Sequence, residues 1–483
     1  MERTSISTRN QKLVEHALGR HAGSRAYHFA LRGVDTFTFS NLKLAAPITE
    51  TIVCCDHGRD HENMLRTGTR RVVSVEKEHG AHMDWSTDDL DKLTSLREYH
   101  DVRSDIERTA SRVTPTLIIP FKNTPTIEAL RSKKATVLSP RCGLVHELDS
   151  KMNLPWILSD AGIDVIPGER VLKHRFDQDA YAGLVQKYGQ KLVSQIAFGS
   201  GGSGTFFTNT KEEIDTVFKR PGADELKISK FIKGPTFNGQ AVVLDTTEGT
   251  RTAVFNPSFQ IIGLPEITDW PSYYCGNDFT GTLDYLGTKG RVQYGETMSK
   301  LGHMLGSMGW KGVFGVDLIW DEAASRLYVL EINPRMQAST SFLNMLQERQ
   351  GMMGIGTYHL LAFLSDRPLP ADFAGAHLTT LNGSHVLVNN KTGDDVMIAG
   401  DLQPGIYNFN GGLHLSEPHH WRAVQDGEYL ITCGVPKQET MVENHATMLK
   451  VYSLEQALNS ARDGLTAHMR RVTESIYQTL RAE

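Results

Sequence analysis

The chain has 483 residues, a formal net charge of -5, 40% hydrophobic residues and 22% charged residues. This length exceeds one ordinary core, so we expect roughly two to four structural units in a soluble globular protein. The charge balance excludes a basic nucleic-acid-binding protein, and no apolar run has the length of a membrane span or a signal peptide. Five cysteines without metal-ligand spacing favour a cytoplasmic protein that has neither a disulfide framework nor a zinc site.

The first unit, predicted over residues 1–145, is a parallel α/β domain. Short apolar runs alternate there with polar stretches that suit helices or loops, such as His57 to Gly68. The expected buried strands are Thr51–Cys55, Arg71–Val75, Thr116–Pro120 and Ala135–Leu138. A Gly-x-Gly-x-x-Gly fingerprint is missing from this region, so a dinucleotide site has no support there.

A glycine-rich turn, Gly199 to Gly204, follows a predicted strand at 191–198 and precedes another that starts at Thr205. Glycines allow backbone N–H groups to converge on an anion, as in phosphate-binding loops. Flexible connectors have the same composition. The position between two apolar strands favours the phosphate loop. Upstream, a helix is expected from about Asp149 to Ala161, closed by Gly162.

Residues 256–292 are rich in Pro, Gly and aromatic residues and are predicted to be an irregular loop, which is often functional when it is this long. A helix is expected from Tyr294 to Met308. From residue 373 to 483 the pattern changes to a separate α+β region. It should contain strands at His377–Leu381, His385–Asn389, Gly405–Phe409 and Tyr429–Cys433, and a helix at Leu454–Leu480.

The most informative stretch is 312–339, where two segments alternate apolar and polar residues on either side of the polar turn Asp321 to Arg326. Folding this hairpin about its middle places Asp317 opposite Glu331 or one residue off. Two facing carboxylates destabilise a sheet unless a cation neutralises them, and a hard divalent cation with oxygen ligands suits this pair. Asn333 and Arg335 share the face of Glu331.

With the glycine-rich turn, the segment Lys230-Phe-Ile-Lys-Gly234 and the series from Asp317 to Arg335, the chain resembles the ATP-grasp superfamily over roughly residues 140–340. The resemblance implies an ATP-grasp core at 146–372, with a glycine-loop subdomain at 165–232 and a metal-binding subdomain at 233–372. These α+β subdomains would clasp ATP with Mg²⁺ or Mn²⁺. The region before the core would be the pre-grasp domain, and 373–483 a C-terminal α+β extension.

The same resemblance implies a role for each matching residue. Metal ligands would be Asp317, Glu331 and Asn333. Lys151 would reach the phosphates, and Arg335 would contact the transferred phosphoryl group. Other nucleotide contacts would come from Gln195, Gly201, Gly202, Ser203, Gly204, Lys230 and Ile232.

Two positions depart from the family pattern. Ser194-Gln195 stands where many members have a second phosphate-binding lysine, and Ser229 stands where the hinge often begins with Glu. Gln195 can still donate a hydrogen bond to a phosphate or to adenine, but it brings no charge. These departures weaken the role assigned to this strand more than they weaken the prediction of the fold.

The expected activity is that of an ADP-forming carboxylate-amine ligase, which activates a carboxylate as an acyl phosphate for attack by an amine. Its substrates would be small carboxylates and amines, such as amino acids or short peptides, with Tyr274 or Asp278 as candidates for contacting the amine. A biotin-carboxylase-like enzyme is an alternative, although Ser339 stands where such an enzyme needs a glutamate. A non-catalytic nucleotide-binding module is a second alternative, and homo-oligomer formation stays open.

Overall fold

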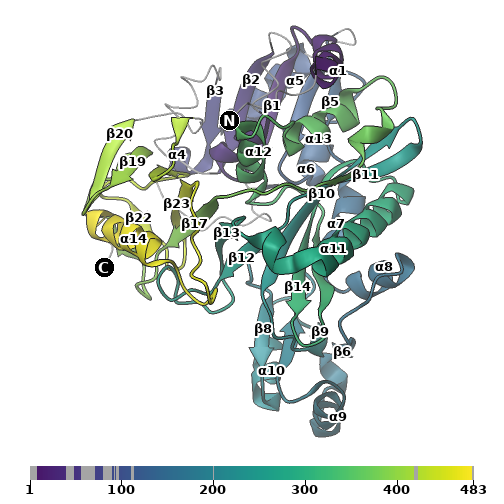
Figure 1. Ribbon diagram of the computed structural model, residues 1–483, viewed down its shortest axis with the longest axis vertical. Coiled ribbons are helices and arrows are strands. Elements are labelled where there is room, and N and C mark those ends of the chain that lie inside the picture. The colour runs from purple at the N-terminus through teal and green to yellow at the C-terminus, as the bar shows by residue number, and fades with distance from the viewer. Residues whose placement is uncertain are drawn as a thin grey trace.

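A computed structural model describes residues 8–39, 48–55, 71–79, 90–91, 93, 97–109, 114–199, 201–417 and 423–480. The segment His57 to Gly68 lies outside these residues. Figure 1 shows an α/β unit at the top, a small lobe at the bottom and a large sheet that connects them and continues to the C-terminal strands. Among the helices of the described ranges, none has the length and apolar character that crossing a bilayer requires.

The N-terminal unit is a five-stranded parallel sheet with strand order β3-β2-β1-β4-β5. Its strands are β1 (Arg25–Ala30), β2 (Thr49–Cys54), β3 (Arg71–Ser74), β4 (Thr116–Pro120) and β5 (Ala135–Val137). The helices of this unit are α1 (Thr8–Gly19), α4 (Val75–His79), α5 (Arg97–Thr109) and α6 (Pro125–Glu128). The predicted parallel α/β character is confirmed, although the central strand β1 was missed. The strand order reverses between β1 and β4, which become neighbours although they are not consecutive.

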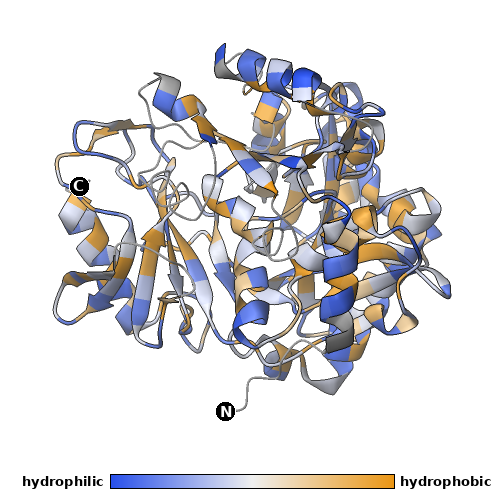
Figure 2. Cartoon of the chain, turned by 90° about the horizontal axis from the view of Figure 1, so that it is seen from above, coloured by the Kyte–Doolittle hydropathy of each residue, from blue (hydrophilic) through white to orange (hydrophobic). Residues whose placement is uncertain are grey.

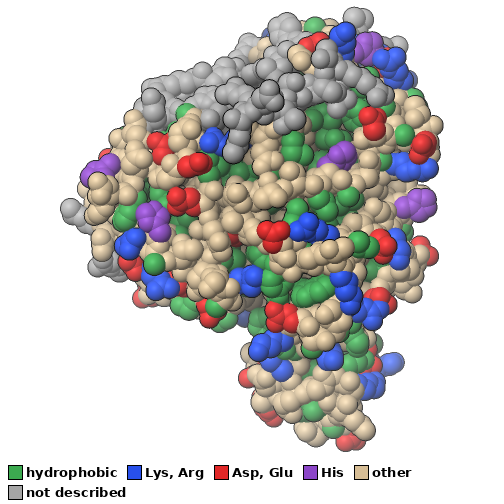
Figure 3. All heavy atoms as spheres, viewed as in Figure 1, with side chains coloured by type: hydrophobic (Ala, Val, Ile, Leu, Met, Phe, Trp, Pro, Cys, Tyr) green, Lys and Arg blue, Asp and Glu red, His purple; other side chains and the backbone are tan. Residues whose placement is uncertain are grey.

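The small lobe is a four-stranded antiparallel sheet with order β6-β9-β7-β8, backed by two helices. Its elements are β6 (Gly168–Leu172), α9 (Gln178–Tyr188), β7 (Leu192–Gln195), β8 (Thr205–Thr208), α10 (Lys211–Val217) and β9 (Glu225–Lys230). Leu192, Leu226 and Ile228 pack with Ile214 in a core of their own. Figure 3 shows the lobe as a projection that carries charged side chains of both signs.

The large sheet has 12 strands in the described part of the chain. Its first half consists of β10 (Thr236–Thr246), β11 (Gly249–Phe255), β12 (Ser258–Ile262), β13 (Tyr274–Asp278), β14 (Gly312–Asp321) and β15 (Arg326–Asn333). Residues 256–292 are therefore not an irregular loop: they contain β12, β13 and the start of a helix. Cross-strand pairing with β10 and with β17 stabilises these two strands, and their short, interrupted apolar pattern did not reveal it.

The C-terminal strands extend the same sheet, because β17 pairs with β13. They are β16 (Gly375–His377), β17 (Ser384–Asn389), β19 (Gly405–Phe409), β20 (Leu413–Glu417), β21 (Glu428–Thr432) and β23 (Thr447–Ser453), while β18 (Val396–Met397) pairs separately with β22 (Met441–Val442). The domain boundary expected near residue 372 thus falls within one continuous sheet.

Helices cover this sheet and connect it to the N-terminal unit. They are α7 (Cys142–Asp149), α8 (Leu154–Asp160), α11 (Thr282–Ser307), α12 (Thr340–Arg349), α13 (Ile355–Leu364) and α14 (Ala467–Leu480). The helix predicted at Leu454–Leu480 begins only at Ala467, since residues 454–466 form an irregular segment that packs against β13. Figure 2 shows apolar residues along the strands that cross the centre and mixed residues on the outer helices.

Candidate active site

A cavity of about 620 Å³ lies where the small lobe, the large sheet and the N-terminal unit meet. The hairpin β14–β15 supplies one wall, and the strands β7 and β9 with the turn between β7 and β8 supply another. All the residues that the sequence nominates for nucleotide, phosphate or metal contact line this one cavity. Its far end is formed by residues that follow β1 and β4 and by residues of β23.

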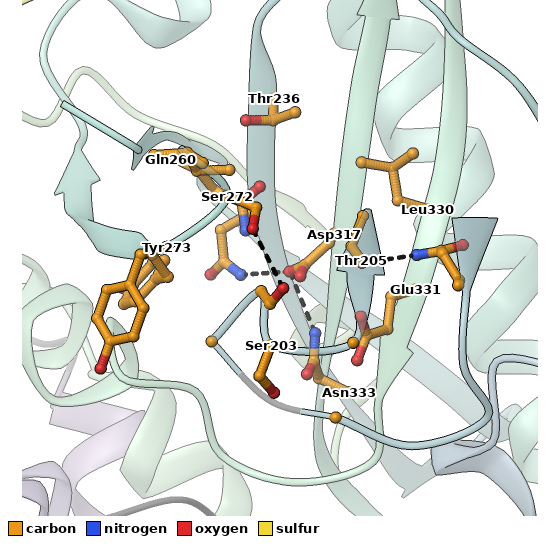
Figure 4. Close-up of a pocket in the computed structure, with 18 of the residues that line it drawn as sticks. Ser203, Thr205, Thr236, Gln260, Ser272, Tyr273, Asp317, Leu330, Glu331 and Asn333 are labelled. Atoms are coloured by element: carbon orange, nitrogen blue, oxygen red, sulfur yellow. Dashed lines mark hydrogen bonds between the residues drawn. The ribbon is translucent and has the colours of Figure 1, made fainter. Parts of the chain in front are cut away.

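The hairpin has the predicted register, with Asp317 paired directly with Glu331 and a bulge just after Asp317. Both carboxylates face the cavity, as Figure 4 shows. The Oδ1 atom of Asp317 accepts hydrogen bonds from three amide groups, at 2.9 Å from Asn238, 3.1 Å from Asn333 and 3.2 Å from Gln337. Strands β10, β14 and β15 therefore hold the Asp317 carboxylate in one fixed position.

No lysine, arginine or histidine of the described residues forms an ion pair with Asp317. Burial, and next the nearby Glu331, raise the pKa of Asp317 to about 6. Glu331 has a cation beside it, since Lys151 Nζ lies 3.2 Å from its Oε1. Among the described residues no group of three His, Cys, Asp or Glu side chains is arranged for a metal. Two carboxylates and an amide oxygen nevertheless suit Mg²⁺, which takes its remaining ligands from water and phosphates.

Lys151 lies in the turn between α7 and α8. The helix predicted to start near Asp149 begins instead at Leu154, since α7 already ends at Asp149. The Lys151 ammonium donates to the carbonyl oxygen of Gly199 at 2.9 Å as well as contacting Glu331. Its backbone N–H donates to Ala197 O at 2.9 Å. One buried lysine thus connects the start of the glycine-rich turn to the carboxylate pair.

The glycine-rich turn joins β7 to β8 and closes over the cavity. Gly201 and Gly202 have φ values of 60° and 91°, which favour glycine. A Cβ on Gly202 would overlap the carbonyl oxygen of Ser272, so the turn lies directly against the segment before β13. Tyr274 N–H donates to Gly201 O at 3.1 Å across this contact. Ser203 and Gly204 also line the cavity.

The predicted hinge leads out of β9 along an apolar slot. Ile232 packs with Ile166 and Ile319 in a small cluster that Leu330 and Tyr328 extend. The backbone N–H of Lys230 donates to Pro167 O at 2.9 Å, and its side chain lines the cavity. Apolar side chains that line a cavity suit a nucleobase.

Arg335 lies just beyond β15 at the junction with the N-terminal unit. Met336 N–H donates to Phe121 O at 3.1 Å, so this segment is anchored to the end of β4. Burial would raise the pKa of Asp149, but the charges of Arg335 and Lys122 hold it below its ordinary value. The Nε atom of Arg335 is buried and has no hydrogen-bond partner among the described residues. The guanidinium therefore keeps a donor for a bound group.

Sequence reasoning missed Lys227. This residue lies on β9 directly opposite Gln195 on β7, and both line the cavity. Gln195 itself donates to Thr205 at 3.1 Å. Burial, offset in part by Glu331, lowers the pKa of Lys227 to about 8. The period of two in strands, which places residue 227 on the same face as Ser229, could have identified it.

The two candidates for contacting an amine lie in different surroundings. Tyr274 lines the cavity, and its hydroxyl contacts Asn277 and lies 3.1 Å from His385 Nε2. Asp278 is 1% exposed and accepts backbone N–H groups of Ala457 and Leu458 at 2.8 and 2.9 Å. Asp278 therefore fixes the C-terminal segment and does not line the cavity.

Ser339 is fully buried beneath the hairpin. Its Oγ donates to Asn238 at 2.8 Å and accepts from Gln240 at 3.0 Å. Asn238 in turn holds Asp317. The side chain at this position supports the carboxylate pair from below and offers no group to a substrate.

Residues 150–339 match the ATP-grasp domain family, and the chain therefore carries an ATP-grasp domain. A curated relative, the [butirosin acyl-carrier protein]--L-glutamate ligase of Niallia circulans, is 21% identical over 236 residues. That alignment covers 48% of this chain and 54% of the relative, so the chain spans about half the length of that protein. The predicted family resemblance is confirmed.

Solved structures share the fold over most of the chain. The biotin carboxylase domain of Hydrogenobacter thermophilus 2-oxoglutarate carboxylase, in complex with MgADP, ADP and bicarbonate, has a TM-score of 0.58 at 13% identity, with 89% of this chain and 86% of that chain covered. Campylobacter jejuni biotin carboxylase also has a TM-score of 0.58 at 13% identity, with 90% and 88% covered. Staphylococcus aureus N5-carboxyaminoimidazole synthetase in complex with ADP gives 0.52 at 13% identity, with 95% and 97% covered. The ATP-grasp fold with its parallel α/β unit is thus confirmed.

Proposed function

We propose that the protein is an ADP-forming ligase that joins a small carboxylate to an amine. The observation that carries this proposal is the single cavity in which a carboxylate pair, a glycine-rich turn and three cations, Lys151, Lys227 and Arg335, meet. Phosphoryl transfer to a carboxylate brings negative charges together, and cations that are already in position stabilise the transition state.

Each wall of the cavity binds a different part of the nucleotide in this proposal. Adenine occupies the slot of Ile166, Ile232 and Ile319, and the backbone N–H groups of the glycine-rich turn cover the terminal phosphates. Asp317, Glu331 and the amide oxygen of Asn333 would hold Mg²⁺ or Mn²⁺, which would supply positive charge to the phosphates. Lys151, which lies between Glu331 and the start of the glycine-rich turn, would contact the phosphates.

Lys227 compensates for the missing lysine on β7. Because Gln195 and Lys227 are direct cross-strand partners, an ammonium group based on β9 reaches the same part of the cavity as one based on β7. The low pKa of Lys227 reflects a buried cation without a close counter-ion, and a bound polyphosphate supplies that counter-ion.

The chemistry then takes two steps. A carboxylate oxygen of the first substrate attacks the γ-phosphorus, the bond to the β-phosphate oxygen breaks, and ADP leaves. The amine nitrogen attacks the carbonyl carbon of the acyl phosphate and loses a proton, and the C–O bond to phosphate breaks. Arg335, which keeps an unpaired Nε donor, stabilises the transferred phosphoryl group.

The buried Ser339 supports the ligase over a carboxylase. A carboxylase of the kind described above needs a glutamate there to act on bicarbonate, and this chain has a hydroxyl that is already used twice. The curated relative, whose name is that of a ligase, supports the same choice.

A mass-spectrometric screen tests the proposal. Pairs of small carboxylates and amines are incubated with the protein, ATP and magnesium, and a product heavier than one substrate by the other minus water is sought together with ADP. Bicarbonate-dependent ADP release without any amine would instead identify a carboxylase. ADP binding without turnover of any pair would favour a binding module.

A further inference from the structure

The far end of the cavity is built by residues that are not among the proposed nucleotide contacts. Arg32 and Phe121 follow β1 and β4, the two neighbouring strands between which the order of the N-terminal sheet reverses. In open α/β sheets, ligands bind outside the carboxyl ends of the strands at such a reversal point. The topology therefore identifies this end of the cavity as a ligand site in its own right.

A lysine from the C-terminal strands closes this end. Lys450 lies on β23, opposite Leu387 of β17, and both residues line the cavity. The Lys450 side chain is only 2% exposed. Within 4 Å, one carboxylate of the described residues is present: Asp35 Oδ1, at 3.9 Å, beyond hydrogen-bond length. Asp35 is held in place by its other oxygen, which accepts Arg32 N–H at 3.0 Å.

Lys450 keeps its charge in this position. Burial opposes the charged form, but the nearby Asp35 carboxylate favours it, and the pKa of Lys450 lies above its ordinary value. A buried ammonium has three donors, and the one nearby carboxylate is too distant to accept a short hydrogen bond. Arg32, whose guanidinium has five donors, lines the same end and can add a donor even while it contacts other groups.

We propose that Lys450 and Arg32 bind a spectator carboxylate, meaning a carboxylate of a substrate other than the one that is activated. This inference rests on the proposed function and names its substrate class. The spectator group is either the second carboxylate of a dicarboxylic acid or the α-carboxylate of an amino acid that acts as the amine. Substrates that lack this group are used poorly.

The test compares matched substrates in two arms. In the acyl arm, succinate and L-glutamate are compared with their half-amides, succinamate and L-glutamine. In the amine arm, L-alanine is compared with ethylamine. The wild-type protein should lose about tenfold to a hundredfold in kcat/KM when the spectator carboxylate is removed in one arm. The arm that shows the loss identifies the source of the carboxylate.

The variant Lys450→Met then tests the residue. It should reduce the preference for the carboxylate-bearing substrate to near one while ADP binding in the presence of magnesium stays at the wild-type level. Lys187→Met, which removes an exposed lysine on α9, is the matched control and should keep the full preference. If Lys450→Met does not fold, the wild-type comparison still decides, because equal use of each matched pair overturns the inference.

A binding measurement separates this inference from the proposed function. Succinate, L-glutamate and L-alanine are titrated against the wild-type protein saturated with ADP and magnesium, alongside their matched analogues. Tighter binding of one carboxylate-bearing partner, lost in Lys450→Met, supports the site. Equal binding of all partners overturns it even if turnover occurs. Failure of ADP itself to bind would overturn the proposed function instead.

Discussion

The two ends of the cavity are built in different ways. At the nucleotide end, the carboxylate pair belongs to one hairpin, and the glycine-rich turn belongs to another. At the proposed substrate end, Lys450 follows both Arg32 and Phe121 by more than three hundred residues, and the three meet only through the folded sheets. The residues proposed to bind the nucleotide are thus encoded locally, while those proposed to select the substrate depend on long-range packing.

Among variants at the proposed nucleotide end of the cavity, Glu331→Gln should reduce activity most. Under the proposed metal assignment, this change removes a ligand of the divalent cation and leaves Lys151 beside a neutral amide, so ADP release should fall on the order of a hundredfold. Glu322→Gln, an exposed change in the turn of the same hairpin, is the control and should keep wild-type activity. Wild-type turnover in Glu331→Gln would remove the metal assignment.

Lys227→Met should lower kcat/KM for ATP by about tenfold to a hundredfold, because a charge-assisted contact to phosphate is lost. Lys219→Met, exposed on the same lobe, should have no such effect. The exchange Gln195→Lys with Lys227→Gln should restore part of the loss, because the two positions are cross-strand partners. If the double variant has the same kcat/KM for ATP as Lys227→Gln alone, a lysine on β9 and a lysine on β7 are not interchangeable.

The lowered pKa of Lys227 also predicts that the stability of the protein depends on pH. Since the pKa of Lys227 is lowered from 10.5 to about 8, the unfolded chain binds more protons than the folded one between these values. The stability of the ligand-free wild type, relative to Lys227→Met, should therefore rise from pH 8 to 10.5. Thermal unfolding of both proteins across this range measures it, and a constant difference would contradict the assignment.

Gly202→Ala should raise the KM for ATP about tenfold. An alanine at this position would have to adopt a positive φ, and its methyl group would overlap the carbonyl oxygen of Ser272. The turn must therefore move away from the segment before β13. Gly201→Ala is the matched control: it also has a positive φ, but its Cβ meets no atom within 4 Å. Equal KM values for the two variants would show that the contact with Ser272 does not matter for ATP.

Asp317→Asn should reveal a dependence of stability on pH that has the opposite sign to that of Lys227. Because the pKa of Asp317 is raised from 3.8 to about 6, the wild-type protein loses stability as pH rises through this window. Without metal at pH 7, Asp317→Asn should be more stable by about 3 kcal/mol, the free energy of this pKa shift, with the gain absent below pH 4. Asp284→Asn, at an exposed position, should show neither change. A less stable Asp317→Asn at pH 7 would contradict the raised pKa of Asp317.

These contrasts explain what the sequence could predict. The hairpin register followed from a strict alternation in 312–333, and the glycine-rich turn followed from its composition. Strands β12 and β13 were missed because pairing with β10 and β17, and not local alternation, stabilises them. Lys227 was overlooked because its importance depends on which strand lies next to β9.

The limit of prediction from the sequence is clearer at the proposed substrate end of the cavity. Nothing near Lys450 in the sequence resembles a binding motif, and its placement depends on the C-terminal strands joining the large sheet through β17. Asp278, whose sequence context suggested a substrate contact, proved to fix the backbone of residues 457 and 458. A charged residue in an aromatic stretch does not by itself distinguish these two roles.

The most direct test of the central claim follows the oxygen atoms. A carboxylate substrate identified by the screen is labelled with ¹⁸O, and the phosphate released during amide formation is analysed by mass spectrometry. Activation as an acyl phosphate predicts one ¹⁸O atom in each phosphate, because the C–O bond breaks in the second step. Unlabelled phosphate would show that the carboxylate never received the phosphoryl group and would contradict the account.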